Sequence, residues 1–408
     1  MPIRTVERTE RHILNSSNPA FALLDSFCFL SKNLYNHANF LIRQEFIQNG
    51  KWLCYNEIDK ILKVDMDYPD YKAMPTAQTA QQTLRLLEKN WKSFFAAIKD
   101  WKIHPEKYLG RPKLPKYRDK DGRFVLVLTN QNCKLKDNRI VFPKVFQGFA
   151  IETKISGKFQ QVRMIPHKDY LVAEVVYKAE IAEELADNGR HLGIDIGVDN
   201  LAAVANNFGE RPILINGRGL KSMNQFYNWK VSHYRCVAAR MNGAKSTGRL
   251  RQLTRKRNEK VRDLIHKASR NIIRYAVERN VSVIVIGKNK GWKQKSDMGK
   301  RNNQNFVQIP FAMFIEQIQY KAEEYGIQVI VTEESYTSGT SVLDGEAPVK
   351  ESYNRVRRIR RGLFRSNAGM LVNADVNAAC QIMKKAFPNE FSDGIEGVVL
   401  RPIRVDVA

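Results

Sequence analysis

The sequence has no closely spaced pair of cysteines. Its five cysteines are scattered through 408 residues, and no Cys-x-x-Cys pair occurs among Cys28, Cys54, Cys133, Cys236 and Cys380. A structural zinc site of the usual ligand spacing is therefore not expected, and neither is a disulfide framework.

Long apolar runs and acidic residues are scarce as well. No stretch reaches the roughly 18 apolar residues that a membrane span needs, and the first residues carry too many charges for a signal peptide. We therefore expect a cytoplasmic protein with no membrane partner. Lys and Arg number 67 against 42 Asp and Glu, a net charge of +25, and this excess favours a nucleic-acid partner.

The clearest pattern in the chain is the segment at residues 191–207, HLGIDIGVDNLAAVANN. Leu192, Ile194 and Ile196 alternate with small residues and Asp195, which is the period of a strand. A second apolar run begins at Leu201 after a short link, so a hairpin is predicted. A carboxylate in a central strand needs an ionic partner or a metal. For Asp195 considered alone, an ordinary salt bridge is the simpler interpretation.

A second informative segment lies near the other end of the chain, at residues 373–385, NADVNAACQIMKK. Its apolar residues recur at helical spacing, and Asn373 and Asp375 are typical helix-capping residues. Considered alone, Asp375 is interpreted as an N-cap.

Together, GIDIGVDNLAAV and NADVNAA resemble the first and third RuvC motifs of the TnpB (OrfB) family, the transposon-encoded RNA-guided nucleases related to type V CRISPR effectors. The resemblance covers nearly the whole chain and implies a fold with α/β, all-β and all-α parts. Helical periodicity and a run of short strands in the first half agree with it. The expected parts are a wedge β-barrel (residues 1–15 and 109–180), a helical recognition lobe (16–108), a RuvC-like nuclease domain of the RNase H fold (189–336 and 371–385), an insertion (337–370) and a C-terminal tail (386–408).

Two features depart from the family pattern. The second RuvC motif normally ends its strand with a glutamate, but Gly287 follows Ile286 here, and the next acidic residue is Asp297. The insertion at 337–370 has none of the cysteines of the family's zinc knuckle and is rich in arginine instead. We expect it to be a metal-free lid over the substrate, with plain disorder as the alternative.

A replacement for the missing glutamate is predicted after the next strand, residues 327–331, where Glu333 and Glu334 stand. If a helix returns the chain to lie parallel to the strand at 281–286, both strands end at the same edge of the sheet. Glu334 is therefore our expected third carboxylate and Glu333 the fallback. The alternative is that both are solvated acids at a strand end.

The resemblance implies a metal-dependent phosphodiester hydrolase in which Asp195, Glu334 and Asp375 are catalytic and metal-binding. Carboxylate oxygens suit Mg²⁺, and two ions are expected, both bridged by Asp195. No His or Cys cluster and no Ser-His-Asp arrangement offers a competing chemistry.

Clustered basic residues are the expected nucleic-acid contacts, although each is a solvated surface residue under the simpler interpretation. The expected partners are a guide RNA and double-stranded target DNA, with one copy of the chain per guide RNA. The candidate contacts are Lys89, Lys92, Lys99, Arg111, Lys113, Lys116, Tyr117, Arg255, Arg257, Lys260, Arg357, Arg358 and Arg361.

The function expected from this resemblance is RNA-guided, Mg²⁺-dependent cutting of DNA beside a short flanking motif that the protein reads. It would take place in a prokaryotic cytosol, at the nucleoid when DNA is bound. The alternative is a catalytically inactive, RNA-guided repressor derived from such a nuclease. The missing glutamate favours the repressor, and the retention of Asp195 and Asp375 in intact motifs favours the nuclease.

Overall fold

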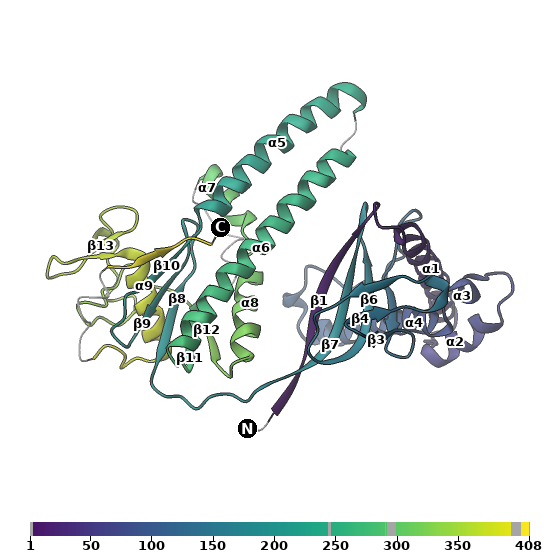
Figure 1. The fold of residues 1–408 in the computed structure, drawn as a ribbon, viewed down its shortest axis with the longest axis horizontal. Coiled ribbons are helices and arrows are strands. Elements are labelled where there is room, and N and C mark those ends of the chain that lie inside the picture. The colour runs from purple at the N-terminus through teal and green to yellow at the C-terminus, as the bar shows by residue number, and fades with distance from the viewer. Residues whose placement is uncertain (1–2, 244–245, 290, 292–298, 393–400, 408) are drawn as a thin grey trace. The chain divides into compact units, whose positions relative to one another are not determined.

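The computed structural model describes residues 3–243, 246–289, 291, 299–392 and 401–407 (Figure 1). The chain divides into two compact units. One is Thr5–Glu180, and the other joins Met1–Arg4 to Ile181–Ala408. Asp297, the first acidic residue after the buried strand, lies outside the described residues.

The helices of the unit Thr5–Glu180 pack around a shared apolar core. Thr76 begins the last long helix, and its side chain accepts a hydrogen bond from the Thr79 N–H. Trp91 is fully buried, and its indole N–H donates to Asn39 Oδ1 over 3.0 Å, so its one polar atom is satisfied inside the core. The helices are α1 (Phe21–Asn49), α2 (Tyr55–Val64), α3 (Asp70–Ala73) and α4 (Ala77–Ile103), followed by the 3₁₀ turn η1 (Pro105–Lys107).

The strands of the same unit form two hydrogen-bonded sheets. The N-terminal strand extends to Asn15 and lies beside a strand from the end of the unit, so the helices interrupt this sheet in sequence. The closed barrel expected here stays a prediction. The first sheet has the order β1 (Ile3–Asn15), β7 (Tyr170–Ala182), β6 (Lys158–Pro166), β2 (Leu126–Thr129). The second contains β3 (Lys134–Lys136), β4 (Arg139–Val141) and β5 (Ala150–Glu152), with the 3₁₀ turn η2 (Lys144–Phe146) between the last two.

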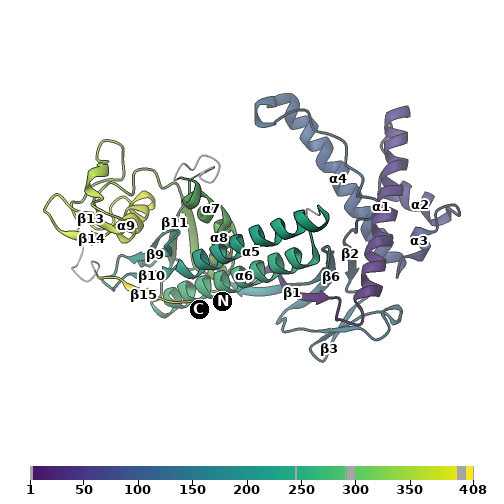
Figure 2. The ribbon, with the colours of Figure 1, turned by 90° about the horizontal axis from the view of Figure 1, so that it is seen from above.

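A six-stranded mixed sheet is the centre of the other unit (Figures 1 and 2). The predicted hairpin is confirmed, because β8 and β9 pair antiparallel with Asp195 opposite Ala203, although the link between them spans residues 196–199. The predicted parallel pairing is also confirmed, since β11 pairs in parallel with both β8 and β12. In order across the sheet, the strands are β12 (Gln328–Thr332), β11 (Val283–Gly287), β8 (His191–Asp195), β9 (Asn200–Asn206), β10 (Ile213–Asn216) and β15 (Ile403–Val405).

Helices cover both faces of this sheet, as alternation along its strands requires. Ile194 points to the face that packs on α6 (Gly248–Glu278) and α8 (Phe311–Glu323). Strands β9 and β11 turn Ala203, Ala205, Val283 and Val285 to the opposite face, where α9 (Ala374–Ala386) packs. Helices α5 (Arg218–Asn242) and α6 pair along their lengths, and α7 (Lys300–Gln308) precedes α8.

Helix α9 packs very close to Gly193 of β8. A Cβ at Gly193 would lie 2.1 Å from the Ala379 carbonyl oxygen, which belongs to the α9 backbone and cannot move aside without shifting the helix. We predict that Gly193→Ala lowers the free energy of unfolding by about 3 kcal/mol, the upper end for overpacking, measured by urea denaturation. The matched control is Gly219→Ala in α5, where the nearest atom is Leu264 Cδ1 at 3.7 Å. It should be neutral or stabilise by up to about 1 kcal/mol. Equal effects of the two substitutions would contradict this explanation.

The segment 337–370 is tied to α9 by buried hydrogen bonds. The Asn377 side chain is fully buried, accepts from the Val342 N–H over 3.0 Å and donates to the Thr340 carbonyl over 2.8 Å. The segment includes the 3₁₀ turn η3 (Arg355–Arg357) and β13 (Leu363–Arg365), which pairs with β14 (Leu371–Asn373).

The end of the chain contributes to the sheet, in contrast to the tail expected for residues 386–408. Strand β15 pairs in parallel with β10, with Ile403 opposite Ile213. Three residues are too short to give a reliable periodic signal, and this explains why the sequence did not reveal the strand. No helix among the described residues is both long enough and apolar enough to cross a membrane.

Candidate active site

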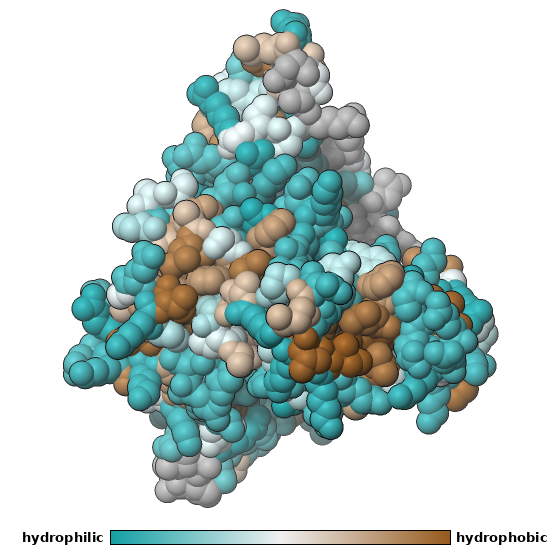
Figure 3. Space-filling model, turned by 90° about the vertical axis from the view of Figure 1, so that its right-hand side faces the viewer, coloured by the Kyte–Doolittle hydropathy of each residue, from teal (hydrophilic) through white to brown (hydrophobic). Residues whose placement is uncertain are grey.

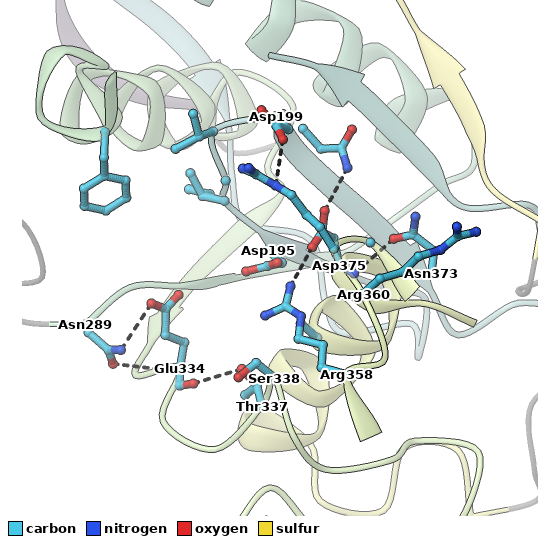
Figure 4. Close-up of a pocket in the computed structure, with 18 of the residues that line it drawn as sticks. Asp195, Asp199, Asn289, Glu334, Thr337, Ser338, Arg358, Arg360, Asn373 and Asp375 are labelled. Atoms are coloured by element: carbon cyan, nitrogen blue, oxygen red, sulfur yellow. Dashed lines mark hydrogen bonds and ion pairs between the residues drawn. The ribbon is translucent and has the colours of Figure 1, made fainter. Parts of the chain in front are cut away.

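Three carboxylates from distant parts of the chain meet at one edge of the six-stranded sheet. Asp195 is the last residue of β8, and Glu334 follows the end of the parallel strand β12. Asp375 is in the first turn of α9. All three line one cavity of about 1350 Å³, and Figure 4 shows Asp195 between Glu334 and Asp375. The structure therefore brings together the three residues that the sequence singled out.

Asp195 is partly buried at the cavity and lies near two like charges. Burial raises the pKa of its carboxyl well above the ordinary value, and the nearby charges of Asp375 and Glu334 raise this pKa further. Arg358 acts in the opposite direction. Among the described residues, the arginines of this cavity pair with Asp375 and Asp199 and none forms an ion pair with Asp195, so the simple salt-bridge interpretation is not supported. A cluster of this kind holds either protons or cations at neutral pH.

Glu334 is held in the cavity by Asn289. The Asn289 amide donates to Glu334 Oε1 over 3.1 Å, and its Oδ1 accepts from the Glu334 backbone N–H over 3.1 Å (Figure 4). Burial raises the pKa of the Glu334 carboxyl to about 7, and the charge of Glu333 contributes. The solvated-acid alternative predicts an ordinary pKa, so this environment favours a functional carboxylate at Glu334.

Glu333, the fallback residue, does not line the cavity. Its side chain is exposed and forms an ion pair with Lys385 of α9. This pairing lowers the pKa of the Glu333 carboxyl. Neighbouring residues after a strand point in opposite directions, which explains why only one of the two acids enters the cavity.

The N-cap interpretation of Asp375 is wrong, because Asn373 caps α9. Asn373 Oδ1 accepts from the backbone N–H groups of Asp375 and Val376 at 3.0 and 3.2 Å. The Asp375 carboxylate is directed into the cavity instead. There it accepts hydrogen bonds from Asn200 Nδ2 at 2.8 Å and from Arg358 Nη2 at 3.2 Å.

Arginines of the segment 337–370 line the same cavity. Arg358 contacts Asp375, and Arg361 Nε lies 2.8 Å from Asp199 Oδ2. Arg357 lies outside the cavity lining and forms a short ion pair with Glu346 over 2.5 Å. The first two arginines are therefore placed to meet an anionic substrate, whereas Arg357 stabilises the segment itself.

The chemistry of the donor set fits Mg²⁺. Every carboxylate here offers hard oxygen ligands, and Mg²⁺ retains several waters, so it needs only one or two carboxylates per ion. Within the described residues, no three His, Cys, Asp or Glu side chains are gathered closely enough to enclose one ion. Glu334 and Asp375 are instead held on either side of Asp195 by Asn289, Asn200 and Arg358. The mutual repulsion at Asp195 is the property that a bound cation relieves.

Most of the predicted nucleic-acid contacts are exposed. In the unit Thr5–Glu180 the exposed candidates are Lys89, Lys92, Lys99, Arg111, Lys113, Lys116 and Tyr117. The face drawn in Figure 3 is largely hydrophilic, with hydrophobic residues gathered in a few patches.

The candidates on α6 differ from one another. Lys260 is exposed, and Arg255 is paired with Glu259 at 3.6 Å. The Arg257 guanidinium donates to Asn224 Oδ1 and to the Gln308 carbonyl over 2.8 Å. It therefore links α5, α6 and α7, and its contact with phosphate stays a prediction.

Sequence reasoning missed the polar residues that surround the carboxylates, namely Asn289, Asn200 and Asp199. Asn289 follows the end of β11 closely, at the same sheet edge as Glu334. Glu334 was selected because parallel strands end at the same edge of the sheet, and the same reasoning applies to Asn289.

Comparisons with known proteins match most of the chain. A family model described as a probable transposase, OrfB of IS605, matches residues 174–293, and a Cas12f1-like TNB domain model matches residues 311–382. A TnpB-like protein, ORF457 of Acidianus two-tailed virus, is 22% identical over 399 residues, covering 88% of this chain and 82% of the relative. The CRISPR-associated endodeoxyribonuclease Cas12f1 of Sulfoacidibacillus thermotolerans is 25% identical over 346 residues, covering 81% of this chain and 72% of the relative.

A solved structure also matches. The cryo-EM structure of a Cas12f1–sgRNA–target DNA complex aligns with a TM-score of 0.51 and 16% identity, and it covers 88% of this chain and 82% of that one. At this level of identity the match shows a shared fold.

Proposed function

The chain belongs to the TnpB (OrfB) family related to the Cas12f type V effectors, and from this premise we propose that it is an RNA-guided, Mg²⁺-dependent DNA endonuclease. Its partners are a guide RNA and double-stranded target DNA, and one copy of the chain acts with each guide RNA. It cuts target DNA beside a short flanking motif.

A single observation carries this proposal. Asp195, Glu334 and Asp375 lie up to 180 residues apart in sequence, yet they line one cavity that also holds Arg358 and Arg361. Acidic groups that repel one another are unfavourable for stability and are typical of catalytic sites. Cations at the mouth of an acidic site suit a substrate that is itself an anion.

In this proposal the carboxylates of the cavity bind metal and its arginines bind substrate. Asp195, between the other two carboxylates, would bind both ions, and Glu334 and Asp375 would each bind one of them. Bound Mg²⁺ ions supply an activated water and stabilise the leaving oxygen in phosphodiester hydrolysis. Arg358 balances the charge of Asp375 and, with Arg361, contacts the phosphates of the strand to be cut.

The remaining parts of the chain bind and position nucleic acid in this proposal. Residues 1–15 and 109–180 act as the wedge and residues 16–108 as the recognition lobe, with the exposed lysines of α4 and the basic segment from Arg111 to Lys116 on the phosphate backbone. Residues 337–370 act as a lid over the substrate. Sequence specificity comes from base pairing with the guide.

A repressor that binds through guide RNA without cutting is the second candidate. It is favoured by Gly287, which stands where the family has a glutamate, and by the lack of a closed three-ligand cluster among the described residues. Purified complex of the chain and its guide RNA, incubated with target plasmid, separates the two candidates. Linearised plasmid in Mg²⁺ and intact plasmid in EDTA are expected for the nuclease. Tight target binding without cutting would establish the repressor.

The Mg²⁺ requirement should depend on pH. With the pKa of Glu334 near 7, protons compete with metal below neutral pH. The Mg²⁺ concentration for half-maximal cleavage should therefore fall as the pH rises from about 6 to about 8, by up to about tenfold per pH unit. Cleavage assays across this range measure the effect. As a comparison, Mn²⁺ binding by the native chain and by Glu334→Gln is measured over the same pH range. If Mn²⁺ binding depends on pH as steeply in the variant as in the native chain, the role of this carboxyl is contradicted.

A further inference from the structure

Two strand ends are held in register next to the active site. Strands β11 and β12 pair in parallel with Gly287 opposite Thr332. The ladder continues one step further, because the Lys288 N–H donates to the Thr332 carbonyl over 2.8 Å. The residues that follow each strand are therefore fixed relative to one another, and Asn289 faces Glu334.

Gly287 has no side chain, and the position that its Cβ would take lies close to the Glu334 side chain. A Cβ at Gly287 would lie 3.2 Å from the Glu334 Cβ, and 2.5 Å from Cδ1 of the fully buried Ile382. Few real Cβ atoms approach so closely. A side chain at 287 would therefore have to displace Ile382 and shift the Glu334 side chain from its observed position. The lack of a side chain at 287 thus leaves room for Ile382 and Glu334 in their observed positions.

Asn289 fixes Glu334 at two points. Its amide donates to the carboxylate, and its carbonyl oxygen accepts from the backbone N–H of the same glutamate, each at 3.1 Å. The backbone bond sets where the side chain begins, and the carboxylate bond sets where it ends. A glutamate free of such bonds loses considerable rotamer entropy when it binds a metal.

We propose that Gly287 and Asn289 are positioning residues for Glu334. Gly287 leaves room beside β12, and the Asn289 amide holds both the backbone N–H and the carboxylate of Glu334. This inference rests on the proposed function, because the proposed function makes Glu334 a metal ligand. Amides and carboxylates that orient a metal ligand typically contribute 10- to 100-fold to metal affinity.

The test compares Asn289→Ala with Lys288→Ala in the full-length chain. Lys288 is the neighbouring residue, its side chain is exposed, and only its backbone contributes to the ladder. Mn²⁺ binding is measured from the electron paramagnetic resonance signal of the free ion, without nucleic acid. Asn289→Ala should weaken Mn²⁺ binding about 10- to 100-fold, and Lys288→Ala should leave it unchanged. The melting temperature of both should remain near that of the native chain.

A double variant shows whether Asn289 acts through Glu334. If it does, Asn289→Ala combined with Glu334→Gln binds Mn²⁺ no more weakly than Glu334→Gln alone. In cleavage assays, excess Mg²⁺ should restore most of the activity of Asn289→Ala but not that of Asp195→Asn. Additive losses in the double variant, or native Mn²⁺ affinity in Asn289→Ala, would overturn the role of Asn289.

Gly287→Ala tests the other half of the proposal. It should weaken Mn²⁺ binding by displacing Glu334, and native affinity in a folded Gly287→Ala protein would overturn this half. Should this variant not fold, Gly287→Ala with Ile382→Ala removes the contact with Ile382 and leaves the one with Glu334. A native chain that binds Mn²⁺ without cutting DNA would refute the proposed nuclease while leaving the positioning roles to be decided by the binding data.

Discussion

Asp195→Asn should reduce DNA cleavage about 1000-fold or more while leaving the fold and target binding intact. The substitution keeps the shape of the side chain and removes the charge that lies between Glu334 and Asp375. Loss of a shared metal ligand removes several kcal/mol of transition-state stabilisation, and about 4 kcal/mol corresponds to about 1000-fold. Single-turnover plasmid cleavage by the complex with guide RNA measures the effect.

Binding provides the internal control for this prediction. Target affinity, measured by gel shift, should be unchanged or slightly higher, because a negative charge is removed from a site that receives phosphate. Asp263→Asn on α6, where the carboxylate is exposed and pairs with Lys267, should cleave like the native chain. Native cleavage by Asp195→Asn would refute the assigned active site.

Glu334→Gln should reduce cleavage about 100-fold, and Glu333→Gln should have little effect. The two residues are adjacent in sequence, but only Glu334 lines the cavity, while Glu333 is exposed and paired with Lys385. Each substitution removes one negative charge with almost no change in volume, so the pair isolates the position of the carboxylate. An amide at 334 still offers one oxygen ligand, and this is why the expected loss, about 3 kcal/mol, is smaller than for Asp195→Asn.

The reverse result would assign the third ligand to Glu333, the fallback. Native rates in both variants would mean that the third carboxylate lies elsewhere in the chain.

Glu334→Gln should also change how stability depends on pH in the absence of metal. The pKa of Glu334 is about 7 in the folded chain against an ordinary 4.5. Between these values the folded chain keeps a proton that the unfolded chain has lost, so stability from this group falls as the pH rises through the window. The variant should therefore have a higher melting temperature than the native chain at about pH 8, and the difference should disappear at about pH 4.

The local patterns of the sequence were sufficient to find the elements that carry the site. Alternation around Asp195 predicted β8, helical spacing after Asn373 predicted α9, and the buried runs predicted β11 and β12. These signals arise within a few residues, because strand and helix periods are properties of the local backbone. The rule that parallel strands end at the same edge of a sheet then identified Glu334 as the third carboxylate of the candidate site.

The polar groups that meet at that edge could be identified only from the folded chain. The tertiary structure placed Glu334 in the cavity and Glu333 outside it, made Asn373 the cap of α9, and assigned Arg257 to interhelix hydrogen bonds. It also added β15 to the sheet.

The physical reason for this division is the range of the interactions. Periodicity reflects neighbours along the chain, whereas the contact between Asn289 and Glu334 joins residues 45 positions apart, and that between Asn200 and Asp375 joins residues 175 apart. The close approach of α9 to Gly193 and Gly287 is of the same long-range kind, because the absence of a side chain at these two positions leaves room for the helix. Local patterns thus define the strands, the helices and the acidic residues they carry, and the packing between these elements brings the acidic residues together at the candidate site.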